Sequence, residues 1–187
     1  MRTFDVDILI VPGWTGSGPD HWQTRWQRRL KQSRVVEQDD WNIVDKRRWT
    51  QRLIEAVTAA DRLVVLVAHS CGVPTVVHAA PDLPAGKVAG AFLVAPASEI
   101  ESSRLPQMDP EFITFPRDPL PFPSLLVASR NDPHCTFDDA GELALAWGSQ
   151  LIDAGEVGHI NTESGHGPWP EGALKFGQFL KRLERPT

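Results

Sequence analysis

A serine stands at an abrupt corner of the sequence, between a run of apolar residues and a segment with helical spacing. The stretch VVLVAHSCGVPT covers residues 64–75 and places Ser70 in an AxSxG pattern, with Ala68 where a glycine is more usual. A tight strand-to-helix turn of this kind exposes a serine hydroxyl at the end of a strand, near the positive end of a helix dipole. The pattern therefore predicts that Ser70 is a nucleophile.

A serine hydroxyl needs a neighbouring base, which is itself oriented by a carboxylate. In hydrolases built on this turn, the acid and then the histidine follow the serine along the chain. The segment ASRNDPHC places Asp132 just after one apolar run, and DAGEVGHIN places His159 just after the next. We therefore predict Ser70, Asp132 and His159 as nucleophile, acid and base. Asp138 and Asp139 are interpreted instead as residues that begin a helix, where acidic side chains favour the dipole.

Other histidines are alternatives for the base. His166, in ESGHGPW, lies seven positions after His159 and stays an open competitor. His134 would reverse the expected chain order. We expect His69, next to the serine, to pack or hydrogen-bond beneath the turn, and we expect His78 to be a structural residue of the following helix.

Acyl transfer also requires hydrogen-bond donors for the developing oxyanion. The backbone N–H of Cys71, directly after the serine, is the first donor expected. The loop PGWTGSGPDHW contains Gly13, which allows a close approach of the main chain, and we expect the N–H of Trp14 to be the second donor. The Trp14 indole is either the wall of an apolar pocket or a structural group. The Cys71 side chain is expected to diverge from Ser70, so Cys71 is not expected to be the nucleophile.

Short runs rich in β-branched residues alternate with segments of helical spacing, which is typical of a parallel sheet with crossover helices. The carboxyl ends of such strands meet at one edge of the sheet, and this brings the three predicted catalytic residues together. We expect strands at 6–11, 34–38, 62–68, 87–95, 123–129 and 149–155. Helical apolar faces are expected at Trp22, Trp26 and Leu30; at Trp49, Leu53, Val57 and Ala60; and at Leu174, Gly177, Leu180 and Leu183.

The length of 187 residues and the 41% hydrophobic content predict a single domain over residues 1–187. The proline-rich stretch 96–123 is expected to be an irregular excursion, either a cover for the site or a surface detour. A net charge of −5, without a basic stripe, indicates no nucleic-acid partner. The first residues contain only a short apolar stretch, and the two cysteines form no disulfide framework. We therefore expect a cytoplasmic protein without a membrane span.

Four blocks together carry a family resemblance: VPGWTGSGPDHWQTRW, VAHSCG, ASRNDP and GHINTESGHGPWPEG. They resemble the small serine hydrolases of the retinoblastoma-binding protein nine family, a minimal α/β-hydrolase group, from Val11 to about Gly172. The resemblance implies a six-stranded parallel sheet in the order 2-1-3-4-5-6 with helices on both faces. It also implies Ser70, Asp132 and His159 as the triad, with GHI favouring His159. The sequence has no LxCxE segment, so a protein partner stays unknown.

Two other enzyme classes fit the residues less well. The glycines of the first loop have the spacing GxxGxG rather than GxGxxG, and bulky Trp14 would obstruct a dinucleotide pyrophosphate. His134, Cys135, His159 and His166 match no zinc spacing. We therefore expect no cofactor and no metal. The expected function is a serine hydrolase, esterase-like, that cleaves a small-molecule ester, thioester or short amide through an acyl-enzyme at Ser70. The alternative is a non-catalytic binding module that keeps the hydrolase fold.

Overall fold

Six parallel strands form one sheet in the order β2-β1-β3-β4-β5-β6. The structure, a computed structural model, describes residues 1–3 and 5–183. The strand order is the one implied by the family resemblance, so the predicted fold class is confirmed. The strands are β1 (Asp7–Val11), β2 (Ser33–Val35), β3 (Val64–Ser70), β4 (Val88–Pro96), β5 (Ser124–Ala128) and β6 (Gln150–Asp153).

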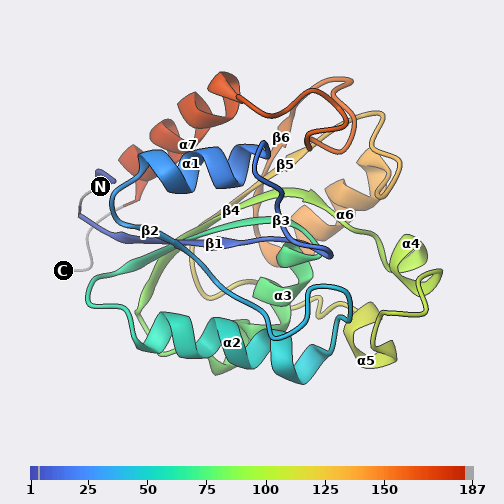
Figure 1. Ribbon diagram of the computed structural model, residues 1–187, viewed down its shortest axis with the longest axis horizontal. Helices are drawn as coiled ribbons and strands as arrows, with labels where there is room; N and C mark the ends of the chain where they lie inside the picture. Colours follow the sequence, from blue (N-terminus) through green and yellow to red (C-terminus); the bar gives the residue numbers. More distant parts are fainter. Residues whose placement is uncertain (4, 184–187) are drawn as a thin grey trace.

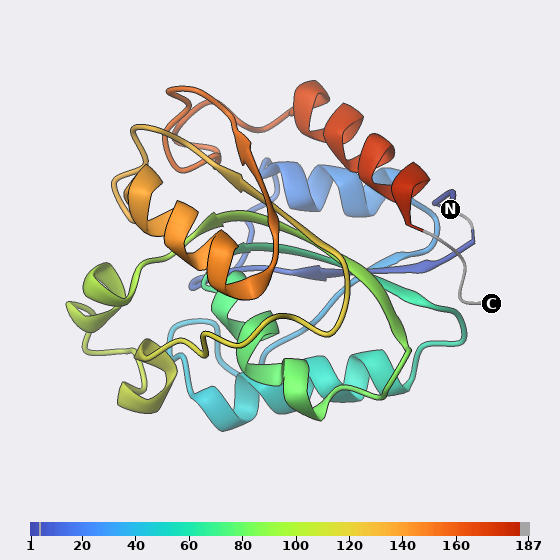
Figure 2. The same cartoon turned by 180° about the vertical axis from the view of Figure 1, so that it is seen from behind.

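Helices cover both faces of the sheet (Figures 1 and 2). Alternate strand residues point to opposite faces, so Leu9 and Leu66 join the core under α2, α3 and α6, whereas Ile8 and Val65 join the core under α1 and α7. The central strands are consequently buried on both sides. The helices are α1 (Trp22–Arg29), α2 (Lys46–Thr58), α3 (Gly72–Ala79), α4 (Glu99–Ser103), α5 (Pro110–Ile113), α6 (Phe137–Trp147) and α7 (Pro170–Arg182), with a short 3₁₀ turn at Ala80–Asp82.

Side-chain caps set several helix starts. The Asp45 side chain accepts a hydrogen bond from the N–H of Arg48 and caps α2, and the Thr136 side chain accepts one from the N–H of Asp139 and caps α6. Asp138 and Asp139 therefore lie in the first turn of α6, as expected. Within the described part of the chain, no helix has both the length and the hydrophobicity that crossing a membrane requires.

Two sequence expectations need correction. The second strand is shorter than 34–38, because it is an edge strand that pairs only with β1. The buried face of α7 was predicted only in part. Leu180 and Leu183 join the core as expected, but Leu174 is 64% exposed, and Phe176 and Phe179 contribute to the core instead. Leu174 lies on the opposite side of the helix and faces solvent, not the sheet.

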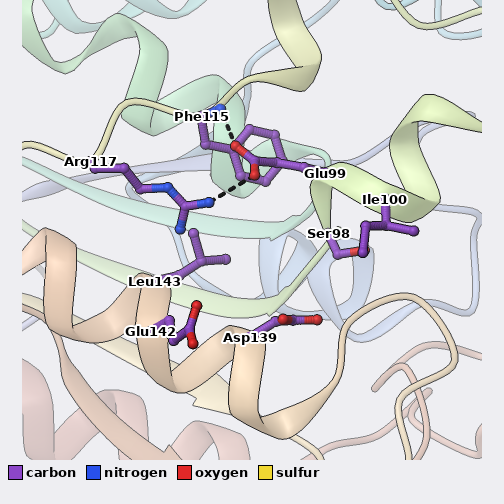
Figure 3. A pocket seen from close by; sticks show the side chains of 8 residues that line it. All are labelled: Ser98, Glu99, Ile100, Phe115, Arg117, Asp139, Glu142 and Leu143. Atoms are coloured by element: carbon purple, nitrogen blue, oxygen red, sulfur yellow. Dashed lines mark hydrogen bonds and ion pairs between the residues drawn. The ribbon is translucent and has the colours of Figure 1, made fainter.

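The proline-rich stretch 96–123 contains α4 and α5 and is fixed to the rest of the molecule at several points. Met108 pairs with Val44 in an isolated bridge, and the N–H of Ser98 donates to the carbonyl of His134. The Glu99 carboxylate accepts hydrogen bonds from the backbone N–H of Phe115 at 2.7 Å and from Arg117 at 2.8 Å (Figure 3). These contacts hold α4 beside the carboxyl end of the sheet.

Candidate active site

Ser70 ends β3 and has a φ angle of +54°, in the left-handed region that only a few non-glycine residues adopt. The β3–β4 register shifts between His69 and Ser70, and α3 begins two residues later at Gly72. A Cβ atom on Gly72 would lie 2.1 Å from the carbonyl oxygen of Val11. The turn can therefore pack against β1 only with glycine at this position.

The first loop packs against this turn from the other side. A Cβ atom on Gly13 would lie 2.8 Å from the Cβ atom of Ser70 and 3.1 Å from the backbone nitrogen of Cys71. The close approach brings Trp14, the residue after Gly13, beside the nucleophile. Both N–H groups predicted for the oxyanion therefore belong to segments in contact with Ser70.

Cys71 is buried at the turn between β3 and α3 and, like Ser70, lines the cavity beside α4. Burial raises the pKa of its thiol to about 11. Because the thiol stays protonated at neutral pH, its proximity does not make it a nucleophile.

Asp132 follows β5 and His159 follows β6, and their side chains form a buried pair. The Nδ1 atom of His159 lies 2.9 Å from Oδ2 and 3.0 Å from Oδ1 of Asp132. The His159 side chain is 8% exposed and the Asp132 side chain is 2% exposed. A carboxylate accepts hydrogen bonds, so Nδ1 carries the hydrogen and Nε2 is left as an acceptor. The backbone N–H of His134 also donates to Oδ1 at 2.9 Å.

The loops that carry this pair are tied together by two residues that the sequence analysis missed. The Ser129 hydroxyl accepts from the N–H of Val157 at 3.0 Å, and the Asn131 side-chain oxygen accepts from the N–H of Gly158 at 2.7 Å. Gly158 has a φ angle of +62°. Both polar residues follow β5 directly in ASRND, a signal that could have identified them.

A cluster of histidines surrounds the pair. The His69 ring is buried, and its Nε2 donates to the backbone carbonyl of His159 at 2.9 Å, as expected for a group beneath the turn. The His21 ring packs on His69, with centroids 4.9 Å apart, and the His134 ring packs on His159 at 4.5 Å. Burial lowers the pKa of His21 to about 4 and the pKa of His69 well below its usual range, so both rings are neutral at pH 7.

The other two histidines have different surroundings. The Nδ1 of His166 lies 3.1 Å from the Ser164 hydroxyl, and the buried His78 donates from Nε2 to the carbonyl of Phe112 at 2.9 Å. Neither lines a cavity that contains Ser70. The structure therefore places His159, and not His166, beside the serine.

Two cavities meet at Ser70 and His159. One, of about 270 Å³, lies under the glycine-rich loop; the other, of about 360 Å³, lies beside α4. Trp14 lines both cavities, and its indole Nε1 donates to the carbonyl of Asn42 at 2.9 Å. In the described residues, no group of three or more histidine, cysteine or acidic side chains is arranged to hold a metal.

The glycine-rich loop is not arranged as a dinucleotide site. Gly13 packs against Ser70, and α1 begins only at Trp22, four residues after Gly18. A dinucleotide fingerprint instead places the helix start at the loop, where the helix dipole meets the pyrophosphate.

Comparisons with known proteins agree with this fold and with a serine hydrolase family. The family model described as serine hydrolase matches residues 8–178. A YdeN-like hydrolase from Pectobacterium atrosepticum is 33% identical and has a TM-score of 0.86, over 98% of this chain and 95% of that one. The YdeN protein of Bacillus subtilis is 20% identical, with a TM-score of 0.81, over 95% of this chain and 100% of that one. The structure of Thermogutta terrifontis esterase 2 phosphonylated by cyclosarin is 14% identical, with a TM-score of 0.69, over 100% of this chain and 88% of that one. The search of curated proteins gave no match.

Proposed function

The chain belongs to the serine hydrolase family, and on that premise we propose that it cleaves a small ester, thioester or short amide through an acyl-enzyme at Ser70. One observation carries the proposal. Ser70 and His159 line the same two cavities, and His159 is hydrogen-bonded to the almost fully buried Asp132. Nucleophile, base and orienting acid thus come from the ends of β3, β6 and β5, respectively.

In the first step, the Nε2 atom of His159 takes the proton of the Ser70 hydroxyl while the serine oxygen attacks the substrate carbonyl carbon. Asp132 holds the proton on Nδ1, so Nε2 is free to accept, and its charge stabilises the imidazolium that forms. His159 then gives the proton to the leaving alcohol, thiol or amine as the carbonyl–heteroatom bond breaks. The product of this step is an ester of Ser70 with the acyl group.

The backbone N–H groups of Trp14 and Cys71 are proposed to bind the oxyanion of the tetrahedral intermediate. Trp14 follows Gly13, whose main chain packs against the Ser70 side chain and the backbone nitrogen of Cys71, so the N–H of Trp14 belongs to a segment beside the nucleophile. In the second step, water attacks the acyl-enzyme with His159 as its base, and the serine and the free acid are released. Loss of one donor should lower kcat by roughly 10²–10³-fold.

The test is the intact mass of the protein after exposure to a fluorophosphonate probe. A single adduct is expected on the wild type, no adduct on Ser70→Ala, and severely slowed labelling of His159→Ala. His166→Ala is the matched control, since that histidine is bound to Ser164 and lies outside both cavities. Ser70→Ala should also lose ester cleavage while its thermal unfolding stays close to that of the wild type.

No adduct on folded wild-type protein, together with no ester cleavage, would contradict the proposal and favour a binding module that keeps the hydrolase fold. An adduct that persists in Ser70→Ala would place the nucleophile elsewhere. If labelling of His166→Ala were slowed as much as labelling of His159→Ala, the assignment of His159 as the base would be wrong.

A further inference from the structure

The two cavities at Ser70 differ in the chemistry of their floors. Beside α4, the buried floor is made of Cys71 and Ala97, with the partly buried Trp14 and Leu105 against it. These side chains belong to one hydrophobic cluster. The Ser102 hydroxyl oxygen in this wall is itself buried, so it presents no polar surface to the cavity. The floor of the α4 cavity is therefore apolar.

The charged residues of the α4 cavity lie at its rim. Arg104 and Glu101 form an ion pair, and their side chains are 66% and 31% exposed, respectively. His134 and Glu163 are also exposed. Because charges at an exposed rim stay hydrated, they do not compete for a group that enters the cavity.

The cavity under the glycine-rich loop has the opposite character. Its buried floor consists of the His21 and His69 rings and the main chain of Gly13, and among the described residues Trp14 is the one hydrophobic residue that lines it. The Nδ1 of His21 accepts from the N–H of Gln23 at 3.2 Å, so the neutral ring carries its hydrogen on Nε2, where it can donate to an acceptor oxygen.

Ser70 and His159 line both cavities, so a carbonyl bound at Ser70 has one half of the substrate on each side. We propose that the substrate is a two-part molecule with one apolar half and one polar half. Its apolar half occupies the α4 cavity against Leu105, and its other half, which carries a hydrogen-bond acceptor oxygen, occupies the cavity floored by His21. This inference rests on the proposed function, because it assigns the two sides of the same scissile bond.

Butyl butanoate, 2-methoxyethyl butanoate and butyl methoxyacetate test the proposal, since each of the last two differs from butyl butanoate by one CH₂ replaced by oxygen. For each protein, the kcat/KM of butyl butanoate divided by that of 2-methoxyethyl butanoate is the apolar-to-polar ratio of the alcohol side. The kcat/KM of butyl butanoate divided by that of butyl methoxyacetate is the ratio of the acyl side. Comparing each ratio between wild type and variant cancels the intrinsic reactivity of the esters. Leu105→Asn should lower the ratio by about tenfold on one side only, because a polar amide replaces the apolar contact.

Ile100→Asn is the matched control. Ile100 lies in α4, five residues before Leu105, and is 61% exposed, but it lines a separate small cavity between α4 and α6 (Figure 3). This variant should shift neither ratio. His21→Phe should raise the apolar-to-polar ratio on the side of the scissile bond that Leu105→Asn leaves unchanged.

A shift on both sides or on neither side with Leu105→Asn would overturn the proposal, as would a shift of the same side by both variants. Ester cleavage with unchanged ratios would overturn the subsite assignment alone. Absence of cleavage of all three esters, with no fluorophosphonate adduct at Ser70, would overturn the proposed function and this inference with it.

Discussion

The Nε2 atom of His69 lies 2.9 Å from the backbone carbonyl oxygen of His159, so the side chain that directly precedes Ser70 is bound to the residue proposed as its base. A carbonyl oxygen only accepts hydrogen bonds, which fixes the hydrogen of His69 on Nε2. The loop held in this way is strained, since Ile160 has a φ angle of +49°. His69 therefore joins the end of β3 to the histidine loop.

His69→Leu should lower kcat by about 10- to 100-fold with a smaller change in KM, because misplacing the base by about 1 Å costs a factor of this order. His69→Gln keeps a side-chain N–H donor and should recover most of the loss. The pH profile of kcat/KM should also change in the leucine variant, which a purely structural role would not produce. Wild-type kcat in His69→Leu would contradict the positioning role.

Asp132→Asn should leave the fold intact and lower kcat by roughly 10⁴-fold, the loss measured for the same change in a Ser-His-Asp protease. The amide can donate a hydrogen bond to Nδ1, which moves the hydrogen of His159 to Nε2 and leaves no acceptor for the serine proton. Single-turnover acylation measures this step directly. Asp138→Asn serves as the control, because that carboxylate lies in the first turn of α6.

Gly13→Ala should abolish labelling of Ser70 by a fluorophosphonate. The added Cβ atom would meet the Ser70 side chain at 2.8 Å, together with the backbone nitrogen of Cys71 and the carbonyl oxygen of His69, both at 3.1 Å. The nucleophile or the oxyanion donors would therefore be displaced. Gly18→Ala is the matched control, since a Cβ atom there meets no other atom within 4 Å. Equal labelling of the two variants would show that the first loop does not constrain the site.

Both cysteines should resist iodoacetamide at pH 7.5 in the folded protein. Burial raises the pKa of Cys71 to about 11 and that of Cys135 to about 12, so thiolate, the reactive species, is scarce. Mass spectrometry should find carbamidomethyl groups only after unfolding. Rapid modification of folded Cys71, with loss of esterase activity, would show that this thiol is accessible and ionised.

The sheet was predictable because each central strand is an unbroken apolar run that ends in a turn or a polar loop. The order of Ser70, Asp132 and His159 along the chain, each after a predicted strand, was enough to predict that they meet at one edge of the sheet. The ends of the edge strands were harder to predict, since β2 and β6 each pair with one neighbour only and that neighbour sets where they end. The face of α7 was misassigned in part because Leu174 and Phe176 are equally apolar in sequence, and only the sheet position decides which is buried.

The finer parts of the site depend on contacts that no local pattern contains. Asn131 bonds to Gly158 across 27 positions of sequence, and His69 bonds to His159 across 90. The packing of Gly13 against Ser70 likewise joins the loop after β1 to the end of β3. Such pairings follow from the fold, so the sequence could name the loops but not their hydrogen bonds.

The folded protein should lose stability as the pH falls below 6.5, because it contains buried neutral histidines. Burial lowers the pKa of His21 from its usual 6.5 to about 4, so the folded protein keeps the ring neutral where the unfolded chain binds a proton. The stabilisation is therefore complete above pH 6.5 and falls between pH 6.5 and 4, at about 1.4 kcal/mol per pH unit for one such group. His69, whose pKa is also lowered by burial, acts in the same direction. Urea unfolding at pH 7, 6 and 5 measures the slope.

His21→Gln separates this effect from general acid unfolding. The variant loses the cap that His21 gives to the N–H of Gln23, so its free energy of unfolding at pH 7 should be lower than that of the wild type. Between pH 6.5 and 5, the free energy of unfolding of the variant should nevertheless depend less steeply on pH than that of the wild type, because the variant lacks one buried neutral imidazole. Parallel slopes in the two proteins would show that the His21 ring is protonated in the folded state, and would refute its lowered pKa.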